Sequence, residues 1–473
     1  MKPSGFFKKT MPVGIDLRAK RVLVVGLART GVAAALFCAA RGASVTASDS
    51  RTESEIGDAI TELKDAGVML ELGSHHQKTF LEQDLIVPSP GVPADEVHLQ
   101  AARAKGVTIW SEIELAYRFL KGRLIGITGS NGKTTTTSLV EHILTTAGIQ
   151  TILAGNIGTP LISCVEAMKD ETCTVVELSS FQLELIDSFR PNIGVFLNLT
   201  PDHLDRHRTM EAYGAAKARL FENQIGEDAA VLNADDVATT PYAPSLPRVF
   251  WFSRKQRVAQ GAYVRGREVV FRQDGAEEVL LKLEDIPLAG SHNVENVLAA
   301  AAVTWLAGAP AKAIAKGVQS FAGVQHRLEF VAEIAGVRYY NDSKATNVDA
   351  ALKALDAFPG RILIILGGKD KGSDYTVLQT ALREKAILAL LIGAAAEKIE
   401  NQIAGSVALE RAETLERAVE TASHAAKRGD VVLLAPACAS FDQFQNYEHR
   451  GRVFKDLVRQ LERQAAGASS GKG

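Results

Sequence analysis

The sequence predicts an α/β protein with three domains in series: a Rossmann-like N-terminal domain, a central P-loop ATPase-like domain and a Rossmann-like C-terminal domain. Short apolar runs recur along the 473 residues, including RVLVVG at 21, RLIGITG at 123 and RILIILGG at 361. Amphipathic, alanine-rich stretches separate most of these runs, which is the pattern of buried parallel strands alternating with helices. Three of the runs end in a glycine-bearing turn that begins a new unit, at Gly26, Gly129 and Gly367.

The predicted domains cover residues 1–111, 112–323 and 324–473. The first boundary lies where WSEIE begins a helix, and the second falls within FAGVQHR. Each of these segments is long enough to bury a core of its own.

The composition favours small-molecule partners. The chain has 53 basic and 55 acidic residues, so no basic surface indicates nucleic acid or anionic membrane. The uncharged run of sixteen residues between Glu295 and Lys312 is too short to span a bilayer. The N-terminal MKPSGFFKKTMPVG does not read as a secretory signal. Four scattered cysteines indicate reduced thiols in the cytoplasm: Cys38, Cys164, Cys173 and Cys438.

The first domain contains a dinucleotide fingerprint with its middle glycine replaced. GLARTG at 26–31 is followed by Asp49 at the end of the next strand. Ala28 adds a methyl group where the backbone would have to approach a pyrophosphate closely. Three interpretations stay open: a nicotinamide cofactor, a uridine diphosphate group, or a turn that binds no ligand.

The second domain begins with a phosphate-binding signature, GSNGKTTTTS at 129–138. A strand that stops at glycine and restarts as a helix aims backbone N–H groups at one point. Lys133 adds a positive charge, and the Thr134 hydroxyl can ligate Mg²⁺. The match is shortened to G-x-x-G-K-T, since Ile127 stands where the longer motif needs glycine. A turn followed by an ordinary helix start is the alternative.

Polar residues follow apolar strands elsewhere in this domain. Asn156, Glu177 and Ser179 lie at predicted strand ends, as does the segment NLTPDHLDRH at 198–207. Open α/β sheets bind ligands at the carboxyl ends of their strands, so these side chains are expected to converge on the Lys133 loop. Glu177 is the first choice for a Mg²⁺ ligand, and a carboxylate paired with lysine is the alternative.

His203 and His207 have the spacing of a zinc protease helix, but Leu204 replaces the glutamate that would act as general base. Zinc hydrolysis is therefore disfavoured, and His203 is the better catalytic candidate because it lies nearer the strand end. Lys217 shares a helix face with Tyr213 and Leu220, so partial burial would lower its pKa readily.

Further candidates lie beyond this cluster. Asn293 and Asn296 share one face of a helix start, where amides suit an adenine edge, although N-capping could explain Asn293. Arg327 lies at the second domain boundary and could bring a cation to a terminal phosphate. Asp342 suits ribose hydroxyls, with Lys344 and Thr346 beside it.

Taken together, these motifs resemble the Mur ligases, the ATP-dependent amide ligases of peptidoglycan synthesis. GSNGKTT, GNIG, ELSSFQLE, NLTPDHLDRH, YGAAKARLF, GSHNVENVLAA and NDSKATN match in order and spacing from Gly26 to Gly451. NDSKATN, LGGKDKG and PACASFDQFQNYEHRG most resemble the members that join D-glutamate to UDP-N-acetylmuramoyl-L-alanine.

The resemblance implies a role for each matching residue. The implied catalytic residues are Lys133, His203, Lys217 and Arg327. The implied ATP-binding residues are Gly129, Ser130, Asn131, Gly132, Lys133, Thr134, Thr135, Asn293, Asn296, Arg327 and Asp342. The implied UDP-sugar residues are Leu27, Ala28, Ser50, Arg51, Asn156, Ser179 and His203. The implied D-glutamate residues are Thr346, Lys371, Ser440, Phe441 and Tyr447. The implied metal ligands are Thr134, Glu177, His203 and Lys217, the last as a carbamate.

The resemblance also implies a cytoplasmic monomer that uses ATP and two Mg²⁺ ions. Its small-molecule substrates would be UDP-N-acetylmuramoyl-L-alanine, D-glutamate and ATP, with no nucleic-acid partner and no membrane insertion. Two departures fall at the amino-acid end: the extra lysine of LGGKDKG, and Tyr447 where phenylalanine is familiar. The rival hypotheses are another Mur or folylpolyglutamate-type ligase, an oxidoreductase and a nucleotide-switch binding protein.

Overall fold

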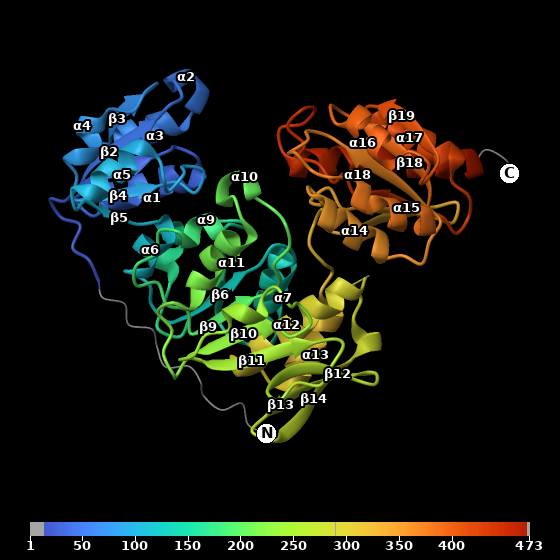
Figure 1. Cartoon of the computed structure of the whole chain (residues 1–473), viewed down its shortest axis with the longest axis horizontal. Helices are drawn as coiled ribbons and strands as arrows, with labels where there is room; N and C mark the ends of the chain where they lie inside the picture. The colour runs from blue at the N-terminus through green and yellow to red at the C-terminus, as the bar shows by residue number, and fades with distance from the viewer. Residues whose placement is uncertain (1–13, 289, 471–473) are drawn as a thin grey trace. The chain divides into compact units, whose positions relative to one another are not determined.

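The computed structural model describes residues 14–288 and 290–470, so most of the N-terminal segment considered above as a signal lies outside the described residues. The chain divides into two compact units. The first comprises Met1–Ile286 with Asn296–Phe321, and the second Pro287–Glu295 with Ala322–Gly473. Three β-sheets flanked by helices confirm the predicted α/β class with three domains in series (Figure 1). The boundaries at 111 and 323 stay predictions.

The N-terminal sheet is parallel, with strand order β3-β2-β1-β4-β5. Its strands are β1 (Arg21–Val25), β2 (Ser44–Asp49), β3 (Met69–Leu72), β4 (Leu85–Pro88) and β5 (Thr108–Ile109). Its helices are α1 (Arg29–Ala40), α2 (Glu53–Ile56), α3 (Ala59–Asp65), α4 (Gln77–Leu81) and α5 (Val97–Ala104), followed by α6 (Glu112–Tyr117). Val22 and Val24 pack with α1, whereas Leu23 and Val25 pack with Phe80 and Leu99, so helices cover both faces.

The central sheet has the order β14-β13-β12-β11-β10-β9-β6-β8-β7. Its strands are β6 (Arg123–Thr128), β7 (Thr151–Gly155), β8 (Cys173–Glu177), β9 (Ile193–Phe196), β10 (Ala229–Asn233), β11 (Arg248–Ser253), β12 (Gly261–Arg265), β13 (Glu268–Gln273) and β14 (Ala276–Lys282). β6 to β12 pair in parallel, and β12, β13 and β14 pair antiparallel. That antiparallel extension is absent from the sequence-based prediction.

The helices around the central sheet are α7 (Lys133–Thr146), α8 (Leu161–Cys164), α9 (Ser180–Leu183), α10 (Leu204–His207), α11 (Met210–Ala218), α12 (Ser291–Leu306) and α13 (Ala311–Ser320). A short 3-10 helix, η2 (Arg219–Phe221), continues α11. Gly317 of α13 packs against Ile143 of α7, where a Cβ would come within 2.9 Å of Ile143. The phosphate-loop helix α7 is therefore held closely on its outer side.

The C-terminal sheet has the order β15-β16-β20-β17-β18-β19 and is parallel except for the β15–β16 hairpin. Its strands are β15 (Glu329–Ile334), β16 (Val337–Asn341), β17 (Ile362–Gly367), β18 (Ala386–Ile392), β19 (Leu409–Glu413) and β20 (Val431–Leu434). Its helices are α14 (Val348–Asp356), α15 (Gln379–Lys385), α16 (Ala396–Ile403), α17 (Leu415–Ala425) and α18 (Tyr447–Ser470). Two cores, one on each face of β17, make this sheet doubly wound as well.

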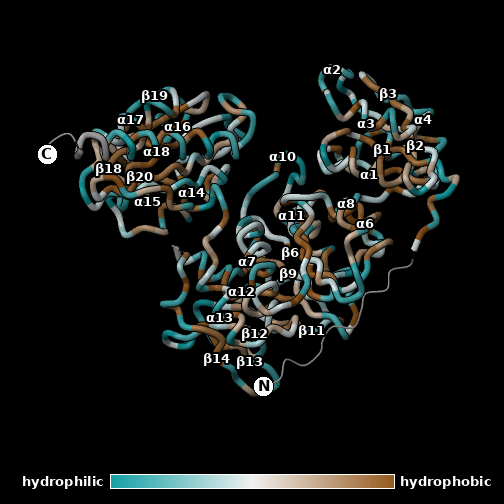
Figure 2. The backbone as a smooth tube through the Cα atoms, turned by 180° about the vertical axis from the view of Figure 1, so that it is seen from behind, coloured by the Kyte–Doolittle hydropathy of each residue, from teal (hydrophilic) through white to brown (hydrophobic). Residues whose placement is uncertain are grey.

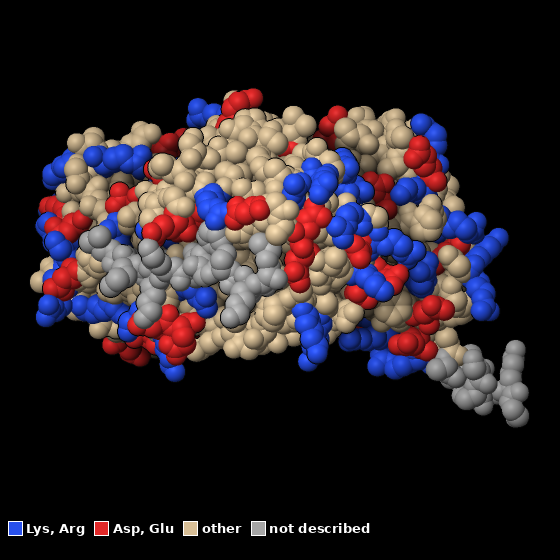
Figure 3. Space-filling view, turned by 90° about the horizontal axis from the view of Figure 1, so that it is seen from below, with Lys and Arg blue, Asp and Glu red and all other residues tan. Residues whose placement is uncertain are grey.

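The distribution of polarity agrees with this architecture. Hydrophobic strand segments lie inside each sheet-bearing part, and hydrophilic segments follow the loops (Figure 2). Lysine and arginine are interspersed with aspartate and glutamate on the face visible in Figure 3. Among the described helices, none is long and apolar enough to cross a membrane. All four cysteines are free thiols.

Candidate active site

The loop between β6 and α7 forms the centre of the candidate site. Gly132 has φ of 83° and caps α7, a left-handed conformation that favours glycine. A Cβ at Gly132 would come within 2.4 Å of the Asn296 Oδ1 atom. Asn296 Oδ1 also accepts a hydrogen bond from the Thr136 hydroxyl at 3.3 Å. The predicted adenine residue Asn296 therefore lies directly against the loop.

A neighbouring asparagine fixes the other side of the loop. Asn198 Oδ1 accepts from the Asn131 backbone N–H at 2.8 Å, and Asn198 Nδ2 donates to the Asn131 carbonyl at 3.0 Å. The Ser130 hydroxyl donates to the Thr200 carbonyl at 3.0 Å. Asn198 and Thr200 belong to the NLTPDHLDRH segment, so that segment supports the phosphate loop. Sequence reasoning missed the supporting role of Asn198.

Two lysine side chains meet at one carbonyl of the loop. Lys133 Nζ donates to the Gly129 and Ser130 carbonyls, both at 2.8 Å, and Lys217 Nζ donates to the same Gly129 carbonyl at 2.8 Å. Lys217 comes from α11, 88 residues further along the chain. The positive charge of Lys133 beside a helix N-terminus is an anion-binding arrangement.

Lys217 is 1 % exposed, with its ammonium group 4.5 Å from the centre of the Tyr213 ring. Burial, followed by the positive charge of Lys133, lowers the pKa of Lys217 well below its usual value. The carboxylates Asp202 and Glu177 oppose that shift. This environment favours the neutral amine, which is the nucleophilic form of lysine.

Glu177 ends β8, directly beside the end of β6. Its Oε1 accepts a hydrogen bond from Asn156 Nδ2 at 2.8 Å, whereas its buried Oε2 has no hydrogen-bond partner among the described residues. A buried carboxylate oxygen without a donor is suited to a cation. Within residues 14–288 and 290–470, no three histidine, cysteine, aspartate or glutamate side chains cluster to hold a metal by themselves. Glu177 and Thr134 therefore fit Mg²⁺ that is also ligated by phosphate and water.

The two histidines have different environments. His207 is buried, with Nε2 2.9 Å from the Ser180 hydroxyl and its ring stacked on Phe181. Burial lowers the pKa of His207 although Glu184 opposes the shift. His203 precedes α10 with φ of 55°, and its side chain is 40 % exposed beside Asp202. His207 is thus a structural residue, and His203 has the access that a substrate contact needs.

The other predicted sugar-binding residues lie at strand ends, but some already have internal partners. The Ser179 hydroxyl caps α9 and exchanges hydrogen bonds with Gln182. Leu27 is buried in the core, so that only its backbone N–H reaches the sheet edge. Asp202, which sequence reasoning left out of the site, lies close enough to Lys217 to affect its pKa. The sequence feature that could have indicated Asp202 is its position in the polar segment NLTPDHLDRH.

The Gly26 turn of the first sheet is bonded to an acid. Leu27 N–H donates to Asp49 Oδ2 at 2.6 Å, and the Arg51 guanidinium binds both Asp49 oxygens, at 3.0 and 2.8 Å. Burial alone would raise the pKa of Asp49, but hydrogen bonds from Arg51 and Leu27 outweigh it and bring the pKa to about 2. Ser50 and Arg51 are exposed beside this pair, and Ala28 precedes α1. Asp49 is therefore occupied where a dinucleotide site would present it to ribose.

In the second unit, Arg327 and Asp342 lie close together. Arg327 sits between His326 and Leu328, whose φ angles of 64° and 42° are strained for residues with side chains. Burial raises the pKa of Asp342 to about 7, opposed by the positive charge of Arg327 and the Leu328 amide. Asn293 is buried in the first turn of α12.

The predicted amino-acid residues gather at the carboxyl ends of adjacent strands. Thr346 follows β16, Lys371 follows β17 and Ser440 follows β20, while Tyr447 begins α18. Lys344 Nζ lies 3.7 Å from the centre of the Tyr447 ring. The ring of Phe441 is 66 % exposed.

A buried guanidinium that sequence reasoning missed joins these loops. Arg450 is 1 % exposed and donates to the Ser343 hydroxyl and carbonyl at 2.9 and 2.8 Å and to the Cys438 carbonyl at 3.2 Å. Burial lowers the pKa of Arg450 to about 10. No pattern in the sequence distinguishes it from a surface arginine of α18.

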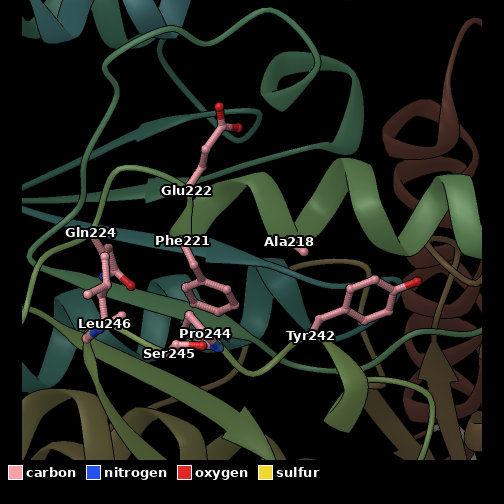
Figure 4. Close-up of a pocket in the computed structure, with 9 residues that line it drawn as sticks. Ala218, Phe221, Glu222, Gln224, Tyr242, Pro244, Ser245 and Leu246 are labelled. Carbon is pink, nitrogen blue, oxygen red and sulfur yellow. The ribbon is translucent and has the colours of Figure 1, made fainter.

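A separate pocket of about 340 Å³ lies beyond the end of α11. In Figure 4, the Phe221 ring of η2 faces the Pro244–Ser245 segment. None of the candidate site residues lines this pocket. We therefore assign it no part in the chemistry.

The fold and the glycine-lysine loop define a class of protein. The chain matches the Mur ligase MurD-like N-terminal domain over residues 20–111, the Mur ligase middle domain over 127–304 and the Mur ligase glutamate ligase domain over 326–438. The chain belongs to the Mur ligase family.

Curated relatives give the closer likeness. The chain is 54 % identical over 95 % of its length to the UDP-N-acetylmuramoylalanine–D-glutamate ligase of Koribacter versatilis, covering 99 % of that protein. It is also 54 % identical over 94 % of its length to the enzyme of the same name from Acidobacterium capsulatum, covering 97 % of it. Among solved structures, it is similar in fold to a MurF ligase of Thermotoga maritima in complex with ADP. That likeness has a TM-score of 0.59 at 16 % identity, over 95 % of this chain and 99 % of the other.

Proposed function

We propose that this protein is an ATP-dependent ligase that joins D-glutamate to UDP-N-acetylmuramoyl-L-alanine in peptidoglycan precursor synthesis. The observation that carries the chemistry is the meeting of Lys133 and Lys217 at the Gly129 carbonyl, with Glu177 nearby. The choice of substrates is supported by relatives of that name at 54 % identity along nearly the whole chain. We propose further that it works as a cytoplasmic monomer, with domains at 1–111, 112–323 and 324–473.

The first step activates a carboxylate. Amide formation from a carboxylate and an ammonium ion is uphill at neutral pH, so the carboxylate must first acquire a leaving group. An oxygen of the L-alanyl carboxylate attacks the γ-phosphorus of ATP, an O–P bond forms, and the bond to the bridging oxygen breaks to release ADP. Lys133 and Arg327 neutralise the charge that accumulates as the two anions meet.

The second step forms the amide. The D-glutamate amine attacks the acyl carbon, the C–N bond forms, and the C–O bond to phosphate breaks. The amine loses its proton to His203 or to water. Thr346, Lys371, Ser440, Phe441 and Tyr447 hold the amino acid, while Leu27, Ala28, Ser50, Arg51, Asn156, Ser179 and His203 surround the UDP-sugar.

The nucleotide and metal ends complete the proposal. Gly129, Ser130, Asn131, Gly132, Lys133, Thr134 and Thr135 surround the phosphates of ATP, and Asn293, Asn296 and Asp342 bind the nucleoside. Thr134, Glu177 and His203 would hold Mg²⁺, which would supply positive charge to the phosphates. The neutral Lys217 amine attacks CO₂: an N–C bond forms, one C=O π bond opens to a carboxylate, and the nitrogen releases one proton. A neutral amine thereby becomes an anionic carbamate, which would offer Mg²⁺ a ligand.

The test is a reconstituted reaction. Purified protein with UDP-N-acetylmuramoyl-L-alanine, D-glutamate and ATP should release ADP and phosphate only when both acceptors are present. A screen of L- and D-amino acids against each UDP-muramoyl precursor should select this pair. ADP release that is indifferent to D-glutamate would refute the proposal.

A further inference from the structure

Two loops of the second unit that carry predicted amino-acid residues are joined through their backbones. Lys369 N–H donates to the Ala439 carbonyl at 2.8 Å, and Ala439 N–H donates to the Lys369 carbonyl at 3.2 Å. Lys369 is the extra lysine of LGGKDKG, and it is exposed. Its contribution to the pairing comes from the main chain, so its side chain does not disturb the junction. The pairing places the segment of Lys371 beside that of Ser440.

The carboxylate of Asp370 organises the turn that contains Lys371. Asp370 Oδ1 accepts from the Tyr375 hydroxyl at 2.8 Å and from the Ser373 backbone N–H at 3.1 Å. Asp370 Oδ2 accepts from Lys398 Nζ of α16 at 2.7 Å. Burial would raise the pKa of Asp370, but the bonds from Lys398 and Tyr375 lower it, so the carboxylate stays ionised. Oδ1 thus holds the turn from Asp370 to Tyr375 together, and Oδ2 links it to α16.

Tyr375 links this turn to the loop after β20. The residue is fully buried, and its hydroxyl lies 2.9 Å from Cys438 Sγ as well as 2.8 Å from Asp370. Burial raises the pKa of the Tyr375 hydroxyl above its usual value and that of the Cys438 thiol to about 11. Both groups therefore keep their protons. The thiol can donate to the tyrosine oxygen while the tyrosine donates to Asp370, so one hydroxyl spans the two loops.

We propose that Asp370 and Tyr375 are positioning residues that hold the Lys371 turn in place to receive the carboxylate of the amino-acid substrate. This inference rests on the proposed function, which assigns Lys371 to D-glutamate. Lys371 is exposed and is followed by Gly372, whose φ is 80°. Without the Asp370 bonds, this turn would have to be ordered when the substrate binds, at a cost in affinity.

The test compares three variants in the ligase assay, with thermal unfolding measured in parallel. Tyr375→Phe removes only the hydroxyl, and Asp370→Asn removes the charge while keeping the shape. Each should raise the KM for D-glutamate by about tenfold while kcat changes less than twofold. The KM values for ATP and the UDP-sugar should stay unchanged. Tyr263→Phe is the matched control, since the buried Tyr263 hydroxyl donates to Glu277 at 2.5 Å in the central sheet.

Failure of the proposed function and failure of this inference give different experimental results. If the wild-type protein forms no product from D-glutamate, the proposed function fails and the inference fails with it. If the wild type is active and both variants retain its KM for D-glutamate, only the inference is overturned. A fall in kcat with equal changes in all three KM values would also overturn it, because that pattern indicates general loss of structure. If the Tyr375→Phe protein does not fold, the KM of the Asp370→Asn protein for D-glutamate decides between these outcomes.

Discussion

Two turns in the first unit have the same local form and opposite electrostatics. Each joins a parallel strand to a helix through glycine: β1 to α1 at Gly26, and β6 to α7 at Gly129. At the first turn a backbone N–H donates to the carboxylate of Asp49. At the second, the ammonium group of Lys133 and the buried amine of Lys217 converge on a carbonyl. A carboxylate thus lies at the start of one helix, and a lysine ammonium group at the start of the other.

The difference shows why a glycine turn alone does not define a ligand. At the Gly26 turn the ionised Asp49, whose pKa is about 2, already accepts the Leu27 N–H, so this amide is not offered to a phosphate. A phosphate at the Gly129 turn would instead meet positive charge and a helix N-terminus. The side chains that reach each turn from elsewhere in the fold therefore decide its chemistry.

The largest effect should come from removing a cation at the Gly129 turn. Lys133→Ala should lower kcat for the ligase reaction by at least about 10^3-fold, the scale of a cation acting on a transferring phosphoryl group. The measurement is steady-state ADP release with both acceptors present. Lys121→Ala, an exposed lysine of the same domain, is the control and should keep its rate. A Lys133 variant within tenfold of wild type would show that the second turn does not rely on its charge.

The next largest effect should come from replacing Lys217, the second lysine at the Gly129 carbonyl. Lys217→Ala should abolish most activity, and a short carboxylic acid should restore part of it by taking the place of the carbamate. Because the neutral amine is needed, carbamylation should increase as pH rises and as bicarbonate is added. Rate is measured against added acid and bicarbonate for both proteins. Full turnover by the Lys217 variant would eliminate the carbamate role.

A smaller effect is expected at the Gly26 turn. Asp49→Asn keeps the shape of the side chain but weakens its bonds to Leu27 and Arg51, and it should raise the KM for the UDP-sugar by about tenfold. The KM for ATP should not change. Asp84→Asn is the matched control for Asp49→Asn, because Asp84 also accepts hydrogen bonds from a backbone N–H and a guanidinium, both of Arg21. Quenching of NADH fluorescence on titration with protein would instead favour a dinucleotide at this turn.

The smallest effect on activity is expected at a buried acid without a basic hydrogen-bond partner. Glu112 accepts from the Ile162 N–H at 2.6 Å, and burial raises its pKa to about 7 despite backbone hydrogen bonds. The folded protein therefore keeps a proton that the unfolded chain loses above its ordinary pKa, and stability falls as pH rises from about 4.5 to about 7.

Glu112→Gln should remove this pH dependence. Its free energy of unfolding relative to wild type should increase by about 2.5 kcal/mol between pH 5 and pH 8. Urea unfolding at both pH values measures this difference, with the exposed Glu62→Gln as control. An equal effect at both pH values would mean that Glu112 is ionised throughout, like Asp49.

Sequence reasoning was most reliable where the signal is local. The valine- and isoleucine-rich runs at 21, 123 and 361 are the strands β1, β6 and β17, because continuous apolar runs bounded by glycine are typical of buried parallel sheets. The segment GAYVRGREVVFRQDGAEEVLLK alternates instead, and its antiparallel strands β12, β13 and β14 were overlooked. The small and polar residues from 464 predict disorder, but helix α18 continues as far as Ser470.

Contacts between distant segments were beyond local patterns. The motif GSNGKT predicts a phosphate loop, but nothing in it indicates that Lys217 reaches the Gly129 carbonyl or that Asn198 supports Asn131. The sequence likewise does not distinguish Arg450 from a surface arginine, since only the fold reveals that its guanidinium is buried among carbonyls.

The contact between Gly132 and Asn296 has a consequence for how this loop can change. A methyl group at 132 would overlap the amide of a residue on α12, and φ of 83° already disfavours any side chain there. A smaller residue at 296 would relieve the overlap but not this backbone strain. Random mutagenesis should therefore retain glycine at 132 even when residue 296, separated from it by 163 residues, is varied as well.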